Sequence, residues 1–178
     1  MASDRIEIVE YDPAWPHMFD TEQAALLNAL AGCPVEAIEH FGSTAVPGLS
    51  AKPVIDILIA VPDLSQAKAS FPERLAALEY VFWANNPQQD RLFFVKGMPP
   101  QGTGRTHHVH VTERIGEMWR RLVFRDYLRA HPTEAASYAV LKRELASGHA
   151  DDREGYTRAK DDFIDQVMRR AYHWSESR

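Results

Sequence analysis

The sequence predicts an α+β protein in which a mixed sheet is flanked by helices and followed by C-terminal helices. Two patterns support this class. The segment 53–60 is apolar except for Asp56, which is typical of a strand buried on both faces of a sheet. In the last third of the chain, apolar residues recur instead every three or four positions, as in amphipathic helices. The 178 residues suffice for one domain with a substantial core, so we expect a single domain over residues 1–178.

The first two thirds of the chain contain the predicted strands. Residues 5–9 alternate polar and apolar side chains, which predicts a short edge strand. Apolar residues at helical spacing between Phe19 and Leu30 predict a helix that ends at Gly32. The patterns that follow predict strands over 35–41, 53–60, 80–83, 91–95 and 107–112, with a helix over 64–79 that Pro72 interrupts or restarts.

The remainder of the chain predicts three helices. The first carries an apolar stripe from Trp119 to Tyr127, at positions i, i+3, i+4 and i+8. The second begins at Pro132 and ends at Gly148. The third begins at Asp151, and its expected buried line is Tyr156, Ala159, Phe163, Val167 and Ala171.

Composition and charge limit the classes of function. No window approaches the roughly eighteen uninterrupted apolar residues of a membrane span, and the first residues lack the features of a secretory signal. The single cysteine, Cys33, suits a reducing compartment, so we expect a cytoplasmic protein. The net charge of -5 argues against binding to long nucleic acid. Residues 91–131 nevertheless hold eight Arg and Lys against three acids, which favours a small anionic ligand.

A Gly-Ser pair directly follows the strand predicted over 35–41. Gly42 and Ser43 allow backbone amides to approach a phosphate closely, and Lys52 follows as a counter-charge. The spacing is not that of a Walker A loop, since Gly42 and Gly48 are six apart and Lys52 lies four further on. The glycines are equally consistent with simple turn geometry. The pair therefore suggests a phosphate site that does not belong to a P-loop kinase.

Asp56 is the ionisable residue of the strand predicted over 53–60. A carboxylate in an apolar strand is costly unless it meets a cation, a metal or hydrogen-bond donors. Phosphoryl and nucleotidyl transfer need Mg²⁺ or another divalent metal held by such oxygen ligands. A structural alternative is a buried carboxylate that caps a loop or pairs with Lys52, which requires the chain to bend because four residues of strand span about 13 Å.

Two histidines, His108 and His110, share one face of the strand predicted over 107–112, and His107 points to the other face. Two imidazoles on one face can bind a metal, donate to phosphate oxygens or act as acid and base. Two histidines alone do not complete a zinc site. A polar sheet face with satisfied histidines is the structural alternative.

Further basic and aromatic residues are candidates for contacts with a phosphate or a base. Arg91 and Arg105 lie beside the predicted site strands, and helical positions bring others over the sheet. Each can equally be a surface charge. The candidates on the helices are Arg125, Lys142, Tyr156 and Lys160, and Trp83 and Trp119 are expected near the site.

Taken with these residues, the chain resembles the GrpB-like family, also grouped as UPF0157. The matching segments are 40–49, 51–58, 107–111, 124–129, 138–142 and 156–160. The resemblance implies the polymerase-β-like mixed sheet of the nucleotidyltransferase superfamily. Similar domains are fused to bacterial dephospho-CoA kinases, which implies a possible protein partner in the CoA pathway. Active nucleotidyltransferases carry paired carboxylates two residues apart on this strand, whereas Val54 and Leu58 flank Asp56 here.

We therefore expect a nucleotide-binding or phosphometabolite-binding protein. In this hypothesis Gly42, Ser43, Lys52, Arg91 and Arg105 bind phosphate. The candidate catalytic and metal-ligating residues are Asp56, His108 and His110. The resemblance suggests nucleotidyl transfer to a small acceptor, and a non-catalytic accessory or sensor module and a metal-dependent phosphohydrolase remain as alternatives.

Overall fold

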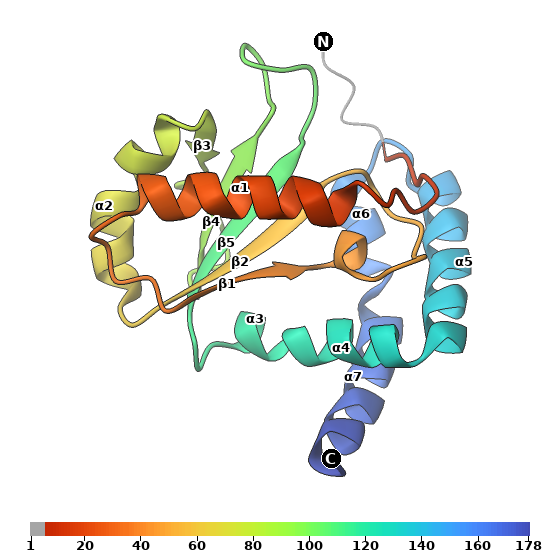
Figure 1. Ribbon diagram of the computed structural model, residues 1–178. Coiled ribbons are helices and arrows are strands. Elements are labelled where there is room, and N and C mark those ends of the chain that lie inside the picture. Colours follow the sequence, from red (N-terminus) through yellow and green to blue (C-terminus); the bar gives the residue numbers. More distant parts are fainter. Residues whose placement is uncertain (1–5) are drawn as a thin grey trace.

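The computed structural model describes residues 6–178 and is built around a five-stranded mixed sheet (Figure 1). The strand order is β1-β2-β5-β4-β3. β2 and β5 are parallel, and every other neighbouring pair is antiparallel. The strands are β1 (Ala37–Phe41), β2 (Ile55–Val61), β3 (Tyr80–Phe82), β4 (Leu92–Lys96) and β5 (His107–Glu113).

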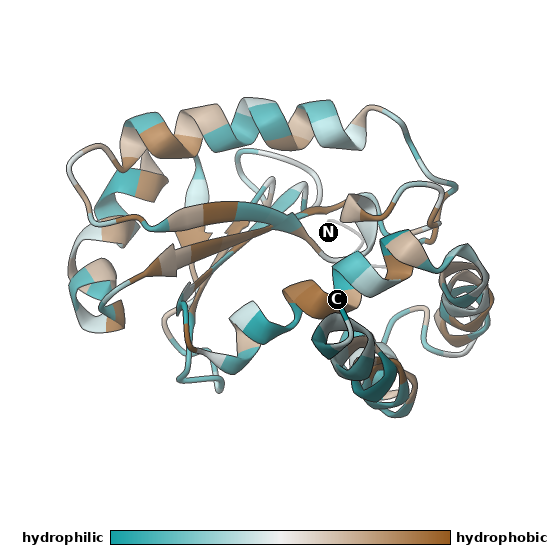
Figure 2. Ribbon diagram, turned by 60° about the horizontal axis from the view of Figure 1, so that its bottom comes forward, coloured by the Kyte–Doolittle hydropathy of each residue, from teal (hydrophilic) through white to brown (hydrophobic). Residues whose placement is uncertain are grey.

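Helices lie on both sides of this sheet. Figure 2 shows α1 (Trp15–Ala29) along one face and the C-terminal helices on the opposite side. α2 (Leu64–Ala76) packs with α1, and a short 3-10 helix, η1 (Ser43–Ala45), follows β1. The C-terminal helices are α3 (Glu117–Arg120), α4 (Leu122–Ala130), α5 (Pro132–Gly148), α6 (Arg153–Arg158) and α7 (Asp161–Glu176). The arrangement confirms the predicted α+β class, with a mixed sheet flanked by helices.

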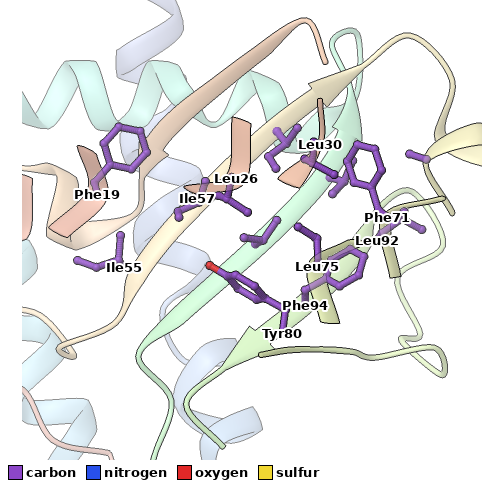
Figure 3. Close-up of a cluster of buried hydrophobic side chains, with 14 of the residues drawn as sticks. Phe19, Leu26, Leu30, Ile55, Ile57, Phe71, Leu75, Tyr80, Leu92 and Phe94 are labelled. Atoms are coloured by element: carbon purple, nitrogen blue, oxygen red, sulfur yellow. The ribbon is translucent and has the colours of Figure 1, made fainter. Parts of the chain in front are cut away.

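The main hydrophobic core lies between the sheet and the helices α1 and α2 (Figure 3). β2 contributes Ile55, Ile57 and Ile59, none of which has exposed surface. Phe71 and Leu75 of α2 are equally inaccessible and pack into the same cluster. Because side chains alternate along a strand, this packing turns Asp56 toward the opposite face of the sheet.

A second hydrophobic cluster joins the C-terminal helices to the loop after β1. Val46 and Leu49 of this loop are buried against Tyr127, Tyr138 and Val167. Two arginines of α4 strengthen the junction: Arg125 donates to the backbone carbonyl of His40 at 2.8 Å, and Arg129 donates to that of Ala45 at 2.9 Å. The helices therefore hold the segment between β1 and β2 in place.

Several predicted elements differ from the structure at their ends. The expected edge strand over 5–9 is wrong for its described residues, where only Val9 forms a bridge, to Ala51; Arg5 lies outside the described residues. The amide of Ile6 bonds the carbonyl of Ala150 instead of a sheet partner. Pro72 does not interrupt α2, since burial of Phe71 and Leu75 holds the helix together around it.

The helical third is divided more finely than predicted. The stripe from Trp119 to Tyr127 spans two helices, α3 and α4, with Arg121 between them. The helix expected from Asp151 is also two helices, α6 and α7, and Ala159 at the junction is exposed rather than buried. No helix within residues 6–178 combines the length and the apolar character that a membrane crossing requires.

Candidate functional site

Asp56, His108 and His110 meet on the sheet face opposite the main core. The parallel register places Asp56 opposite His108 and Leu58 opposite His110. The Nδ1 atom of His108 lies 2.9 Å from Oδ1 of Asp56. The rings of His108 and His110 are 6.3 Å apart. The two histidines thus share a face, as their alternation in sequence predicts, and Asp56 bonds His108 rather than pairing with Lys52.

The three side chains present a set of metal-ligating atoms. One donor atom from each lies within 4.8 Å of the other two. Nε2 of His108 and Nδ1 of His110 are buried and have no hydrogen-bond partner among the described residues. Unsatisfied buried nitrogens are unusual in native proteins. Two imidazoles with a carboxylate suit zinc and other transition metals better than Mg²⁺, which prefers oxygen ligands.

Electrostatics keep the ligand atoms in the form that binds a metal. Burial alone raises the pKa of Asp56, but the hydrogen bond from His108 and the charges of His108 and Lys52 outweigh it, so the pKa lies below its usual value. Burial lowers the pKa of His110 to about 3 against the opposing attraction of Asp56. At neutral pH the carboxylate is therefore ionised and His110 is neutral, as metal coordination requires.

Gly42 packs directly on the carboxylate of Asp56. Its φ angle is 71° and its ψ angle is -170°, a combination that is almost confined to glycine. A Cβ atom at this position would lie 2.5 Å from Oδ2 of Asp56. The close approach that the sequence suggests at Gly42 is thus made to Asp56. Gly48 also has a positive φ of 78°, but a Cβ atom there would have nothing within 4 Å.

Two lysines, Lys52 and Lys160, lie close enough to Asp56 for its charge to act on them, and both act in turn on Lys142. The charges that act on Lys142 are all positive, from Lys160, Arg143 and Lys52. Burial, followed by these charges, lowers the pKa of Lys142 to about 7. Burial also lowers the pKa of Lys52, to about 8. The neighbouring cations Arg153, Lys160 and Arg105 lower it further, whereas the negative charge of Asp56 raises it.

Lys160 completes the group. Burial lowers its pKa to about 8, although Asp56 and Asp161 attract its charge. Its Nζ atom lies 4.2 Å from the centre of the Tyr156 ring, and that of Lys52 lies 5.4 Å from the same ring. We call Lys52, Lys142 and Lys160 the lysine cluster, because the pKa of each is lowered by burial and by neighbouring cations.

The remaining predicted residues divide into two groups. Arg91 and Arg105 stand near the site: the charge of Arg91 acts on His110, and that of Arg105 acts on Lys52. Arg125 instead bonds Glu39 at 2.7 Å and Asp126 at 2.8 Å, so internal partners already use its charge. Lys142 donates one bond to the backbone carbonyl of Ser50, which leaves two of its three donors.

One residue of this neighbourhood was not predicted. Tyr138 of α5 is buried beside Ser43 and Tyr156, and its electrostatic environment includes Asp56. Burial raises its pKa, so the hydroxyl stays protonated and can donate a hydrogen bond. The spacing from Tyr138 to Lys142, one helical turn, is the signal that would have found it, because residues at i and i+4 share a face.

Comparison with known proteins identifies relatives across almost the whole chain. The family model described as GrpB protein matches residues 5–170. UPF0157 protein PA4798 of Pseudomonas aeruginosa is 51% identical over 94% of this chain and 68% of its own length. UPF0157 protein YqkA of Bacillus subtilis is 40% identical, and this chain spans about half of it, 49%. The crystal structure of GrpB from Enterococcus faecalis superposes with a TM-score of 0.83 at 35% identity, covering 94% of this chain and 99% of that one.

A dephospho-CoA kinase is a more distant relative. That of Mycolicibacterium paratuberculosis is 29% identical over 97% of this chain, which spans 47% of the kinase. The similarity therefore concerns a part of the kinase chain.

Replacing Gly42 with alanine tests the contact with Asp56. We expect Gly42→Ala and Gly48→Ala each to lose about 1–3 kcal/mol of unfolding free energy through backbone strain. Only Gly42→Ala adds a collision with the carboxylate, which should cost about 1–3 kcal/mol more. Urea unfolding of the two variants measures the difference, and equal losses would show that the carboxylate does not restrict this position.

Proposed function

The chain belongs to the GrpB family, and we propose that it binds a nucleotide or a related phosphorylated small molecule together with a divalent metal ion. The observation that carries this proposal is the lysine cluster beside Asp56. Buried cations that repel one another destabilise a fold unless they serve another purpose. A phosphate-bearing ligand supplies the missing negative charge, and its oxygens accept the charge-assisted hydrogen bonds that lysines donate.

The metal part of the proposal rests on the donor atoms at Asp56, His108 and His110. One donor atom from each of the three side chains lies within 4.8 Å of the other two, which fits a bound ion, and the Nδ1 atom of His110 is buried there without a hydrogen-bond partner among the described residues. A divalent ion here would neutralise phosphate charge beside Asp56. The two imidazoles of the donor set favour zinc and other transition metals over the Mg²⁺ expected from the sequence.

Asp56, His108 and His110 match the two-metal nucleotidyl transfer of the nucleotidyltransferase superfamily less well. Paired metals require several bridging carboxylates, whereas Leu58 occupies the position two residues after Asp56. The nearest acid across the sheet from Leu58 is Glu39, which is held by Arg125. A single-metal site remains compatible with nucleotidyl transfer to a small acceptor, and the two histidines equally suit a metal-dependent phosphohydrolase.

A second candidate function is a binding module without catalysis. The lone carboxylate of the donor set favours it, and so does the similarity to part of a dephospho-CoA kinase. In this case the same site would sense a nucleotide or CoA precursor on behalf of a partner enzyme. Turnover of a bound nucleotide in the presence of zinc or manganese distinguishes an enzyme from such a module.

Charge removal within the lysine cluster tests the binding proposal. We expect Lys52→Gln and Lys160→Gln to weaken binding of ATP and of inorganic tripolyphosphate roughly 10- to 100-fold, the value of one hydrogen bond to a charged group. Arg169→Gln, an exposed change on α7, should leave binding unaltered. Isothermal titration calorimetry with Mn²⁺ present measures these affinities.

The same two lysine variants should weaken ligand binding without destabilising the ligand-free protein. Because the lysines are held below their usual pKa in the ligand-free protein, their removal should leave its melting temperature unchanged or raised. Loss of binding together with loss of stability would identify structural lysines instead. Absence of binding by the parent to either phosphate compound would refute the proposed function.

Proton uptake provides an independent test of the lysine cluster. With pKa values of about 8, Lys52 and Lys160 are half protonated at pH 8 in the free protein. A bound anion raises these pKa values, so binding must take up protons, and affinity must fall as pH rises from 7 to 9. Titrations of tripolyphosphate at pH 8 in buffers of different ionisation enthalpy should give different heats. Equal heats in all buffers would contradict this prediction.

A further inference from the structure

The lysine cluster lies at one end of the candidate site, where β2 and β5 begin. The two strands are parallel, and Asp56, the second residue of β2, pairs with His108, the second residue of β5. Lys52 precedes β2, and its charge acts on Asp56. The Nζ atoms of Lys52 and Lys160 both lie over the ring of Tyr156 on α6, so these two lysines share this end of the site.

Arg91 lies at the other end of the site, past His110. β4 runs antiparallel to β5, and its first residue, Leu92, pairs with Val111. Arg91 directly precedes Leu92, so it lies toward the end of β5 rather than toward its beginning. The strand advances about 10 Å over the three residues from His108 to Val111. The metal-ligating side chains therefore lie between the lysine cluster and Arg91.

The guanidinium group of Arg91 has few acceptors of its own. Its side chain is only 14% exposed, and its Nη1 atom donates to Sδ of Met118 at 3.2 Å. Met118 belongs to α3, among the C-terminal helices on the side of the sheet opposite α1 (Figure 2). A thioether is a weak acceptor, and Asp90, at 4.0 Å from Nε, is too distant for a hydrogen bond. Most donors of this arginine thus lack a strong partner among the described residues.

A second arginine, Arg121, acts on the same end of the site. It lies between α3 and α4, and within the described part of the chain its exposed side chain makes no hydrogen bond or ion pair. Its charge acts on both Arg91 and His110. The leading charges on His110 are those of Asp56, His108 and these two arginines, with no lysine among them. The site therefore has two separate groups of cations.

We propose, resting on the proposed function, that Arg91 and Arg121 form a second anion subsite. It binds the carboxylate or phosphate group of a second small molecule, while the phosphates of the first ligand lie at the lysine cluster. The planar fork of donors in a guanidinium group matches the paired oxygens of either group. A transferase with this subsite would take an acidic acceptor. The mostly buried position of Arg91 suits a small group better than a protein surface.

Titration of a second anion into protein saturated with Zn²⁺ and inorganic tripolyphosphate tests this subsite. Fluorine NMR follows two probes, monofluorophosphate and trifluoroacetate, which present the phosphate and the carboxylate separately. We expect at least one probe to bind the saturated protein, and the tighter probe identifies the group. If tripolyphosphate abolishes binding of both probes, one polyphosphate spans both groups of cations and the separate subsite is refuted.

Variants at the two arginines connect probe binding with the subsite. Arg121→Gln and Arg91→Gln should each weaken the probe about 10-fold or more, the value of one hydrogen bond to a charged group, and leave tripolyphosphate unaltered. Arg121→Gln should also keep the melting temperature of the parent, because this side chain makes no internal bond. Arg120→Gln is the matched control: it removes the neighbouring charge, which pairs with Glu117 at 3.8 Å, and should change neither ligand.

The outcomes separate this subsite from the proposed function. Equal weakening of the probe and of tripolyphosphate by the arginine variants would overturn the second subsite while the phosphate site stands. So would an unchanged probe affinity in Arg91→Gln and Arg121→Gln. Failure of the parent to bind tripolyphosphate would overturn the proposed function itself.

Discussion

The contact between the backbone of Gly42 and the carboxylate of Asp56 is the constraint on which the site depends. The carboxylate is held on one side by this glycine and on the other by the hydrogen bond to His108. The register of β1 with β2, which places Phe41 opposite Asp56, fixes where the chain must turn. The loop that follows then delivers Ser43 and, after its buried Val46 and Leu49, Lys52 to the same side of the sheet.

The charges around Asp56 explain why this arrangement is kept despite its cost. Burial and mutual repulsion disfavour the charged forms of Lys52, Lys142 and Lys160. Two nearby histidine nitrogens are buried without partners. Each feature alone opposes folding, and together they form a site that is more favourable when an anion and a metal ion are present. Binding and stability should therefore respond in opposite directions when a lysine is removed.

The parts of the site that follow from local sequence were predictable. The apolar run with Asp56, the alternation of His108 and His110, and the Gly-Ser turn each depend on strand geometry or on one backbone angle. The ion pair between Arg125 and Glu39 was not predictable, because Glu39 lies on a strand 86 residues away in sequence. Tyr138 was not predicted as a site residue because its contacts, among them Ser43, are also distant in sequence.

The C-terminal helices also show that local sequence patterns do not predict where tertiary contacts divide the chain into elements. An apolar stripe identifies a buried face, but it does not reveal that the chain turns at Arg121 between α3 and α4. Residues 5–9 have the alternation of a strand, yet the described ones make only one bridge, from Val9 to Ala51. The amide of Ile6 instead bonds the carbonyl of Ala150, which lies just after α5. Local patterns therefore predicted the sheet and its site strands better than the junctions that tertiary contacts decide.

A crystal structure with Mn²⁺ and inorganic tripolyphosphate tests the central claim most directly. The account predicts an anomalous scattering peak within about 2.0–2.3 Å of donor atoms from Asp56, His108 and His110. It also predicts phosphate oxygens within hydrogen-bonding distance of Lys52 and Lys160. A metal peak elsewhere, or phosphates bound away from the lysine cluster, would contradict it.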